Sequence, residues 1–285
     1  MRRYELSDAQ WDRIADLMPR SNPRGGGVWR DHRQVVDGLM WKLNTGAQWR
    51  DIPERYGPWQ TIYERFVRWR YDGVFERILD RLRLQLDADG RIDVDLWCID
   101  GTSIRASRSA VGGGKRGADE PADHALGRSR GGFGTKIHLV TDGNGLPLAA
   151  VLSAGQLQEI SFAVAALEAV SLPTRRGRRR TKPRKLAGDK GYSANRFRQY
   201  LRRRHIEPVI AMRKDERRRT HQGRPPRFDR EAYRRRNAVE RGIGWLKGCR
   251  SVATRHDKLA VNYMTFIKLA MIQRCLRVSR PSDRT

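Results

Sequence analysis

The spacing of apolar residues changes near residues 87–90 (DADG), and this change constrains the fold more than any other feature of the sequence. Before it, apolar residues recur with the 3.6-residue period of helices. After it, apolar and other residues alternate with the two-residue period of a strand, beginning with Ile92, Val94, Leu96 and Cys98. The sequence therefore predicts an all-helical domain over residues 1–90 and an α/β domain over residues 91–285.

The helical domain combines an apolar core with a basic face. Ser7 and Gln10 have the spacing of a capping box, which predicts the start of the first helix. The helix after Gly57-Pro58 carries Arg65 and Arg68 opposite its apolar face. Compact helices of this kind resemble a helix-turn-helix unit, whose third helix enters a DNA groove. We expect Arg65 and Arg68 to contact DNA; the alternative is a helical domain that serves packing or dimerisation.

The second domain is predicted to be a mixed sheet flanked by helices. A strand leads to Asp100, and a Gly-, Ser- and Arg-rich loop that we expect to be mobile follows over 107–131. The remaining predicted elements are a hairpin over 135–153, a helix over 160–170, a basic run over 175–185, a strand over 184–188 that leads to Asp189, a helix over 196–204, a strand over 206–212, a basic loop with Arg217–Arg219, Arg224 and Arg227, a helix over 230–248 and an apolar helix over 258–276.

Two of the acids stand where predicted strands end. In an open α/β sheet, functional groups gather at the carboxyl ends of parallel strands, so Asp100 and Asp189 would lie side by side if their strands are parallel neighbours. Glu240, on a helix packed beside them, would complete a cluster of three carboxylates. Such hard oxygen donors suit Mg²⁺ or Mn²⁺. Taken singly, each aspartate also fits an ordinary turn. Other acids and two histidines are predicted to be solvent-facing, turn-forming or structural: Asp93, Asp95, Asp123, Asp142, His138 and His256.

The helix over 230–248 carries a charged stripe. Tyr233, Arg236, Glu240 and Lys247 follow one another at spacings of 3, 4 and 7 residues, so they fall within about 60° of arc. One carboxylate flanked by cations suits a metal held close to a phosphate. The alternative is a solvated helix face on which Arg236 pairs with Glu240.

The charge of the chain points to a polyanionic partner. Lys and Arg number 59 against 32 Asp and Glu, giving a net charge of +27 and a pI of about 11.2. Nucleic acid is the usual partner of such a protein, with an anionic membrane surface as the alternative. The first ten residues lack the apolar segment of a secretion signal, and MTFIKLAMI (264–272) is too short to span a bilayer. Three separated cysteines form no metal or disulfide pattern, so we expect reduced thiols in the cytoplasm: Cys98, Cys249 and Cys275.

Three motifs carry a resemblance to a known family. They are IDGTSIRA around Asp100, AGDKGYSA around Asp189, and Y-x2-R-x3-E-x6-K from Tyr233 to Lys247. With supporting stretches along nearly the whole chain, they resemble DDE-type insertion-sequence transposases of the insertion sequence 5 family. One departure is His256, where the family pattern leads us to expect Tyr.

The resemblance implies an RNase H-like catalytic domain behind a helix-turn-helix-like domain that recognises DNA ends. It implies that Asp100, Asp189 and Glu240 are catalytic and bind two Mg²⁺ ions, which Mn²⁺ can replace. It also places Arg236 and Lys247 near DNA phosphates, and we expect Tyr233 and Lys190 to bind DNA as well. The implied partners are double-stranded element ends and target DNA, held by a homodimer or larger assembly. Two alternatives stay open: a host RNase H-like nuclease, and a non-catalytic DNA-binding protein derived from a transposase.

Overall fold

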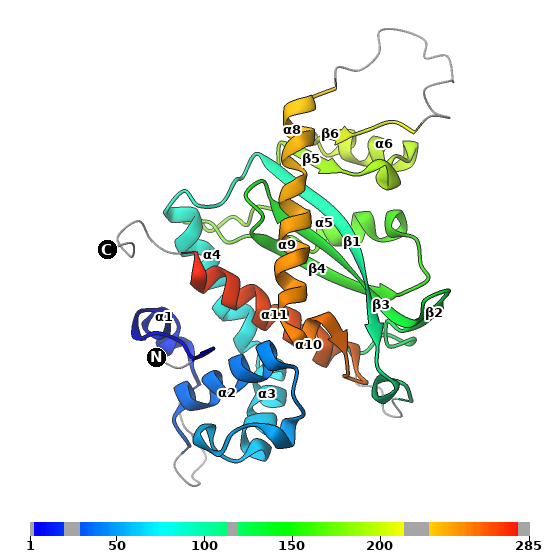
Figure 1. The fold of residues 1–285 in the computed structure, drawn as a ribbon. Helices are drawn as coiled ribbons and strands as arrows, with labels where there is room; N and C mark the ends of the chain where they lie inside the picture. The colour runs from blue at the N-terminus through cyan, green and yellow to red at the C-terminus, as the bar shows by residue number, and fades with distance from the viewer. Residues whose placement is uncertain (1–2, 20–28, 113–118, 214–227, 279–285) are drawn as a thin grey trace, which may run out of the picture. The chain divides into compact units, whose positions relative to one another are not determined.

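The structure, a computed structural model, describes residues 3–19, 29–112, 119–213 and 228–278 (Figure 1). Two predicted loops lie wholly or partly outside these residues: the basic loop with Arg217–Arg219, Arg224 and Arg227, and the part of the predicted mobile loop that covers 113–118.

The chain forms two compact units that are not continuous in sequence. Unit 1 comprises Met1–Gln85, Ala106–His124 and Leu246–Thr285, and unit 2 comprises Leu86–Arg105 and Ala125–Trp245. The functional division into residues 1–90 and 91–285 remains a prediction. The boundary between the compact units differs from this division, because two later segments, Ala106–His124 and Leu246–Thr285, pack with the N-terminal helices.

Unit 1 is helical, as predicted for its N-terminal part. The capping box of Ser7 and Gln10 is present at the start of α1. The core joins segments far apart in sequence: the Phe66 and Phe266 rings stack with centroids 4.9 Å apart, and Trp49 lies 5.9 Å from Phe266. The main helices are α1 (Asp8–Asp12), α2 (His32–Thr45), α3 (Trp59–Tyr71), α4 (Val74–Ala88), which continues into unit 2, α10 (Arg250–Ala253) and α11 (Ala260–Arg277).

Unit 2 is built on a mixed sheet, which confirms the predicted fold class. The strands lie in the order β2-β3-β1-β5-β6, and β4 also pairs with β3. The pairs β1–β3 and β3–β4 are antiparallel, whereas β1–β5 and β5–β6 are parallel. The strands are β1 (Leu96–Ala106), β2 (Gly127–Ser129), β3 (Gly132–Asp142), β4 (Pro147–Ala154), β5 (Lys185–Gly188) and β6 (Glu207–Ile210).

Helices of unit 2 pack against this sheet (Figure 1). Helix α5 (Ala163–Glu168) contacts β3 and β4, and α6 (Asn195–Arg203) contacts β6. Helix α8 (Arg230–Arg235) contacts β5 and β6, and α9 (Asn237–Gly248) follows it along the chain (Figure 1). A side chain at Gly242 would place its Cβ 3.0 Å from the Thr141 methyl group, so glycine permits the close approach of α9 to the sheet.

The structure departs from the predicted elements most clearly at three places. One is the loop predicted over 107–131, which contains the strand β2 (Gly127–Ser129) paired with β3. The strand expected to end at Asp100 continues to Ala106, because β3 pairs with it from Trp97 to Arg105. The helix expected over 230–248 is interrupted at Arg236, between α8 and α9. The N–H of Arg236 donates to the Tyr233 carbonyl and that of Val239 to the Arg236 carbonyl, so the helix tightens to three-residue hydrogen bonds at this point.

Candidate active site

Asp100 and Asp189 lie at the same edge of the parallel pair β1–β5. Ile99 and Gly188 are the last paired residues of these strands, and the two aspartates follow them directly. The Asp189 carboxylate accepts the N–H of Gly191 at 2.7 Å, which fixes it at the start of a short turn. The Asp100 carboxylate accepts the N–H of Gly101 at 2.8 Å. The predicted condition, that these strands are parallel neighbours, is met.

Sequence reasoning missed a third carboxylate at this place, that of Glu159. A Cβ on Gly101 would lie 2.6 Å from Cδ of Glu159, so the carboxylate rests directly on β1 beside Asp100. Lys136, from β3, pairs with Glu159 at 3.5 Å. The sheet topology could have indicated Glu159. Strand β4 runs in the same direction as β1, so the chain that leaves β4 returns past the end of β1 where Asp100 lies.

Burial and like charge act on these carboxylates together. The pKa of Asp100 is raised to about 6, chiefly by burial and also by the charges of Glu159 and Asp189, whereas the hydrogen bond from the Gly101 N–H and the charge of Arg236 lower it. Within the described residues, neither Asp100 nor Asp189 has a salt-bridge partner. Tyr192 is fully buried and its hydroxyl has no hydrogen-bond partner in the described part of the chain. Burial raises the pKa of Tyr192, and the three carboxylates add to this effect.

Glu240 is held by Arg236 rather than by the aspartates. The Arg236 guanidinium lies 2.7 Å from the Glu240 carboxylate and 5.7 Å from the centre of the Tyr233 ring. Its positive charge also lowers the pKa of Asp100. The i,i+4 pair considered as the alternative for this stripe is therefore present, and its cation acts electrostatically on the aspartate site as well.

The remaining predicted DNA-contact residues differ in exposure. Lys190 and Lys247 are exposed, and Lys247 belongs to the part of α9 in unit 1. Arg68 is exposed, but the placement of Arg65 on an open basic face is wrong. Arg65 is only 9% exposed because its guanidinium lies 3.5 Å from the centre of the Trp29 ring.

Two other predictions concern residues of the hairpin. Asp142 is a turn residue but is not solvent-facing: it is fully buried and accepts N–H groups from Asp93, Asn144 and Leu146. His138 is structural, since it is buried against Phe162 and hydrogen-bonded to Ser153 at 2.8 Å. Burial lowers its pKa to about 4, so it stays neutral.

The donors at this edge fit a hard divalent cation in chemical type. Asp100, Asp189 and Glu159 supply carboxylate oxygens, which Mg²⁺ prefers. The pKa of Asp100 is raised chiefly by burial and further by the charges of Glu159 and Asp189, and a bound cation would oppose both effects. As they stand, no three His, Cys, Asp or Glu side chains in the described residues are gathered closely enough to ligate an ion together. A bound cation would have to draw these side chains closer.

Comparison with known families decides the assignment. Residues 95–273, more than half of the chain, match the family model described as "Transposase DDE domain", and residues 6–79 match "Putative transposase of IS4/5 family". The chain belongs to the DDE transposases of the IS4/5 group. It is therefore an enzyme of DNA transposition, and the family implies that it depends on a divalent metal.

Two curated relatives match parts of this transposase, and one of them carries a transposase name. The "Putative transposase for insertion sequence element IS402" of Burkholderia cepacia is 34% identical over 154 residues, which cover 53% of this chain and 67% of that protein. The uncharacterized protein y4sN of Sinorhizobium fredii is 33% identical over 108 residues, 38% of this chain and 81% of that protein.

Among solved structures, the Mos1 strand transfer complex is similar at a TM-score of 0.26 and 13% identity, covering 90% of this chain and 80% of that one. At so low a TM-score the likeness carries no weight for function.

No helix in the described residues is long and apolar enough to cross a membrane.

Proposed function

We propose that this transposase binds the terminal inverted repeats of an insertion sequence, cleaves the element ends and joins the 3′-hydroxyls to target DNA. The observation that carries the proposal is the position of Asp100 and Asp189, directly after the last paired residues of two parallel strands. The net charge of +27 supports a DNA partner, because phosphate contacts dominate the affinity of such proteins.

The carboxylates Asp100, Asp189 and Glu240 are assigned to hold two Mg²⁺ ions, which Mn²⁺ can replace. Glu159 joins this set, since it lies against β1 beside Asp100. Bound ions of this kind activate the attacking oxygen and stabilise the leaving oxygen of a phosphodiester. Arg236 is then in a position to release Glu240 and pair with a DNA phosphate, because a guanidinium binds both kinds of oxyanion.

The other parts of the chain hold and position the DNA. Tyr233, Lys190, Lys247 and Arg68 are assigned to phosphate contacts, whereas Arg65 supports the fold of the helical region through Trp29. Residues 1–90 recognise the element ends and residues 91–285 carry the chemistry. A homodimer or larger assembly is required, since two element ends must be brought together for joining.

The deciding experiment is cleavage of DNA taken from both sides of the gene, with Mg²⁺, by the wild type, Glu240→Gln and the control Glu231→Gln. Glu231 is an exposed acid in the first turn of α8 and is not one of the proposed metal-binding residues. We expect defined cuts by the wild type and Glu231→Gln, none by Glu240→Gln, and equal DNA binding by all three. Cuts without joined products would indicate a nuclease, and binding without cuts by any of the proteins would indicate a non-catalytic DNA-binding protein.

A further inference from the structure

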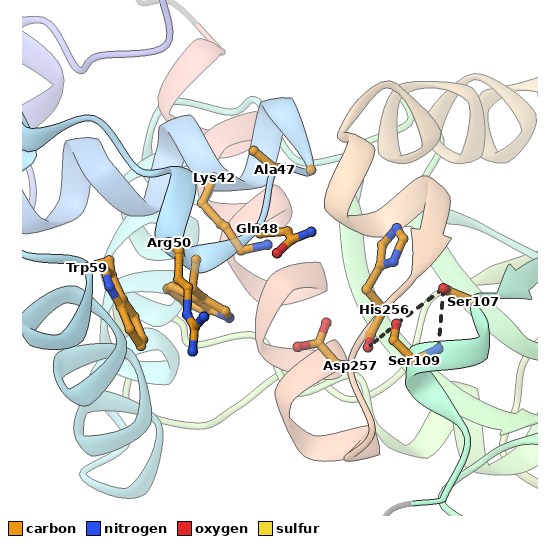
Figure 2. Close-up of a pocket in the computed structure, with 11 residues that line it drawn as sticks. Lys42, Ala47, Gln48, Arg50, Trp59, Ser107, Ser109, His256 and Asp257 are labelled. Carbon is orange, nitrogen blue, oxygen red and sulfur yellow. Dashed lines mark hydrogen bonds between the residues drawn. The ribbon is translucent and has the colours of Figure 1, made fainter.

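Unit 1 contains a cavity of about 700 Å³ that the proposed chemistry does not use (Figure 2). This volume lies in the range of sites for small ligands. The cavity is lined by residues from the end of α2 and the loop after it, the start of α3, the segment with Ser107 and Ser109, and the segment before α11, all within unit 1. Six of the lining side chains are charged or aromatic: Lys42, Trp49, Arg50, Trp59, His256 and Asp257.

Lys42 brings a buried positive charge to this cavity. It is 7% exposed, and its ammonium makes no hydrogen bond or ion pair within the described residues. The ammonium lies 5.2 Å from the centre of the Trp49 ring and 5.3 Å from that of Phe266, and the charges of Asp257 and Asp51 attract it without forming an ion pair. Burial of a charge that makes no ion pair is costly, so a hydrogen-bond acceptor from outside the chain would stabilise this site.

Aromatic rings and a second cation line the same cavity. Figure 2 shows Arg50 beside Trp59, and the guanidinium lies 5.8 Å from the centre of that ring. Trp59 is half-buried and Arg50 is exposed, so the ring offers a face while the guanidinium reaches solvent. An aromatic face next to a cation is the combination by which proteins hold an unstacked base and its phosphate.

An acid in the cavity narrows the class of ligand. The Asp257 carboxylate faces the cavity from the side opposite Arg50 and Trp59 (Figure 2). Lys42 and Asp257 attract each other electrostatically, yet no ion pair joins them in the described residues. The carboxylate would repel a bare phosphate. A nucleobase satisfies both groups, because its edge carries hydrogen-bond acceptors and donors together.

We propose that this cavity holds one unstacked nucleotide of the DNA substrate, with its base against Trp59 and Trp49 and its edge between Lys42 and Asp257. The backbone phosphate then lies on Arg50 and His256 at the open rim. The inference rests on the proposed function only in taking DNA as the substrate. It assigns to unit 1 a means of recognising a base that has left the duplex.

The test compares two duplexes of one sequence, fully paired or with a single unpaired thymidine, bound to the full-length protein without Mg²⁺. We expect the duplex with the unpaired thymidine to bind roughly tenfold more tightly. Trp59→Ala and Asp257→Asn should remove this preference and leave binding of the paired duplex unchanged. Tyr71→Ala is the matched control, since Tyr71 is an aromatic residue of α3 that is 70% exposed and lies outside the cavity.

A second readout does not depend on variants that fold. With 5-iododeoxyuridine as the unpaired base, ultraviolet crosslinking should attach the DNA to a peptide containing Trp49 or Trp59. Equal affinity for both duplexes, or crosslinks elsewhere only, overturns the nucleotide site while the transposase proposal stands. Failure of both duplexes to bind overturns the proposed function instead. If thymidine monophosphate binds and the duplexes are not distinguished, the cavity takes a free nucleotide and its assignment to DNA is wrong.

Discussion

In unit 2 burial raises the pKa of Asp100 to about 6, whereas in unit 1 burial lowers the pKa of Lys42. Both shifts disfavour the charged form, and neither group has a salt-bridge partner in the described residues. Lys185 and Asp229 give the contrasting case: they pair at 2.6 Å, and each shifts the pKa of the other toward the charged form. The chain thus pairs some charges internally and leaves two others, of opposite sign, without an ion pair in the described residues.

The carboxylate site should give the largest effect. Asp100→Asn and Asp189→Asn should each reduce DNA cleavage roughly a thousandfold or more, because metal binding contributes several kcal/mol to such reactions. Strand cleavage at saturating DNA measures this, and DNA affinity should change little. Cleavage near the wild-type rate by either variant would remove that aspartate from the site.

A second comparison should show whether Glu159 as well as Glu240 contributes to metal binding. We expect Glu159→Gln to reduce the rate of DNA cleavage roughly 10- to 100-fold. It should also weaken the thermal stabilisation that Mg²⁺ gives to the protein. Gly101→Ala should act in the same direction, since its methyl group would displace the Glu159 carboxylate. If Glu159→Gln keeps both properties and Glu240→Gln loses both, Glu159 serves only to pair with Lys136.

The raised pKa of Asp100 predicts a gain of stability when its charge is removed. The folded pKa of about 6 exceeds the ordinary 3.8, so ionisation costs stability as pH rises, fully above about 6 and not at all below 3.8. Without metal, Asp100→Asn should be more stable than the wild type at pH 8 by about 1–2 kcal/mol, allowing for solvent screening. The gain should disappear toward pH 4.

Urea unfolding at the two pH values measures this difference, with Asp229→Asn as the control of opposite sign. Asp229 has a lowered pKa, chiefly from its hydrogen bond with Lys185, so its replacement should reduce stability above the ordinary carboxyl pKa. Equal stability of Asp100→Asn and the wild type at pH 8 would mean that another group already neutralises Asp100.

Replacing Lys42 should give the smallest effect on stability, and its dependence on pH should run in the opposite direction to that of Asp100. Because burial lowers its pKa, Lys42→Met should stabilise the protein by roughly 1 kcal/mol at neutral pH, and the gain should shrink toward the ordinary lysine pKa of 10.5. The control is Lys185→Met, which should destabilise because it leaves Asp229 unpaired. A loss of stability in Lys42→Met would show that the ammonium is already satisfied within the chain.

Patterns along the chain were enough to predict the sheet, its hairpin and the adjacency of Asp100 and Asp189. The period of apolar residues reports which face of an element is buried, and strand ends report where side chains meet. The break at Arg236 was not predictable, because it is a local tightening of hydrogen bonds inside a segment of uninterrupted helical character.

Glu159 and Arg65 escaped prediction for a different reason. Glu159 reaches Asp100 through the return of the chain after β4, a tertiary contact that no local pattern encodes. Arg65 has the spacing of an exposed basic face, but a ring from a distant loop, Trp29, covers it. Long basic side chains often lie along aromatic surfaces, so sequence alone does not separate a cation that meets DNA from one that packs.

The discontinuity of unit 1 governs when a nascent chain can become functional. Phe66 stacks on Phe266, and the Ser251 hydroxyl donates to the Lys42 carbonyl at 2.8 Å, so the N-terminal helices complete their core only with residues made much later. At typical bacterial synthesis rates the intervening residues 86–245 take roughly ten to thirty seconds. During that interval the apolar faces of α2 and α3 lack their cover. An interrupted translation product therefore cannot assemble unit 1.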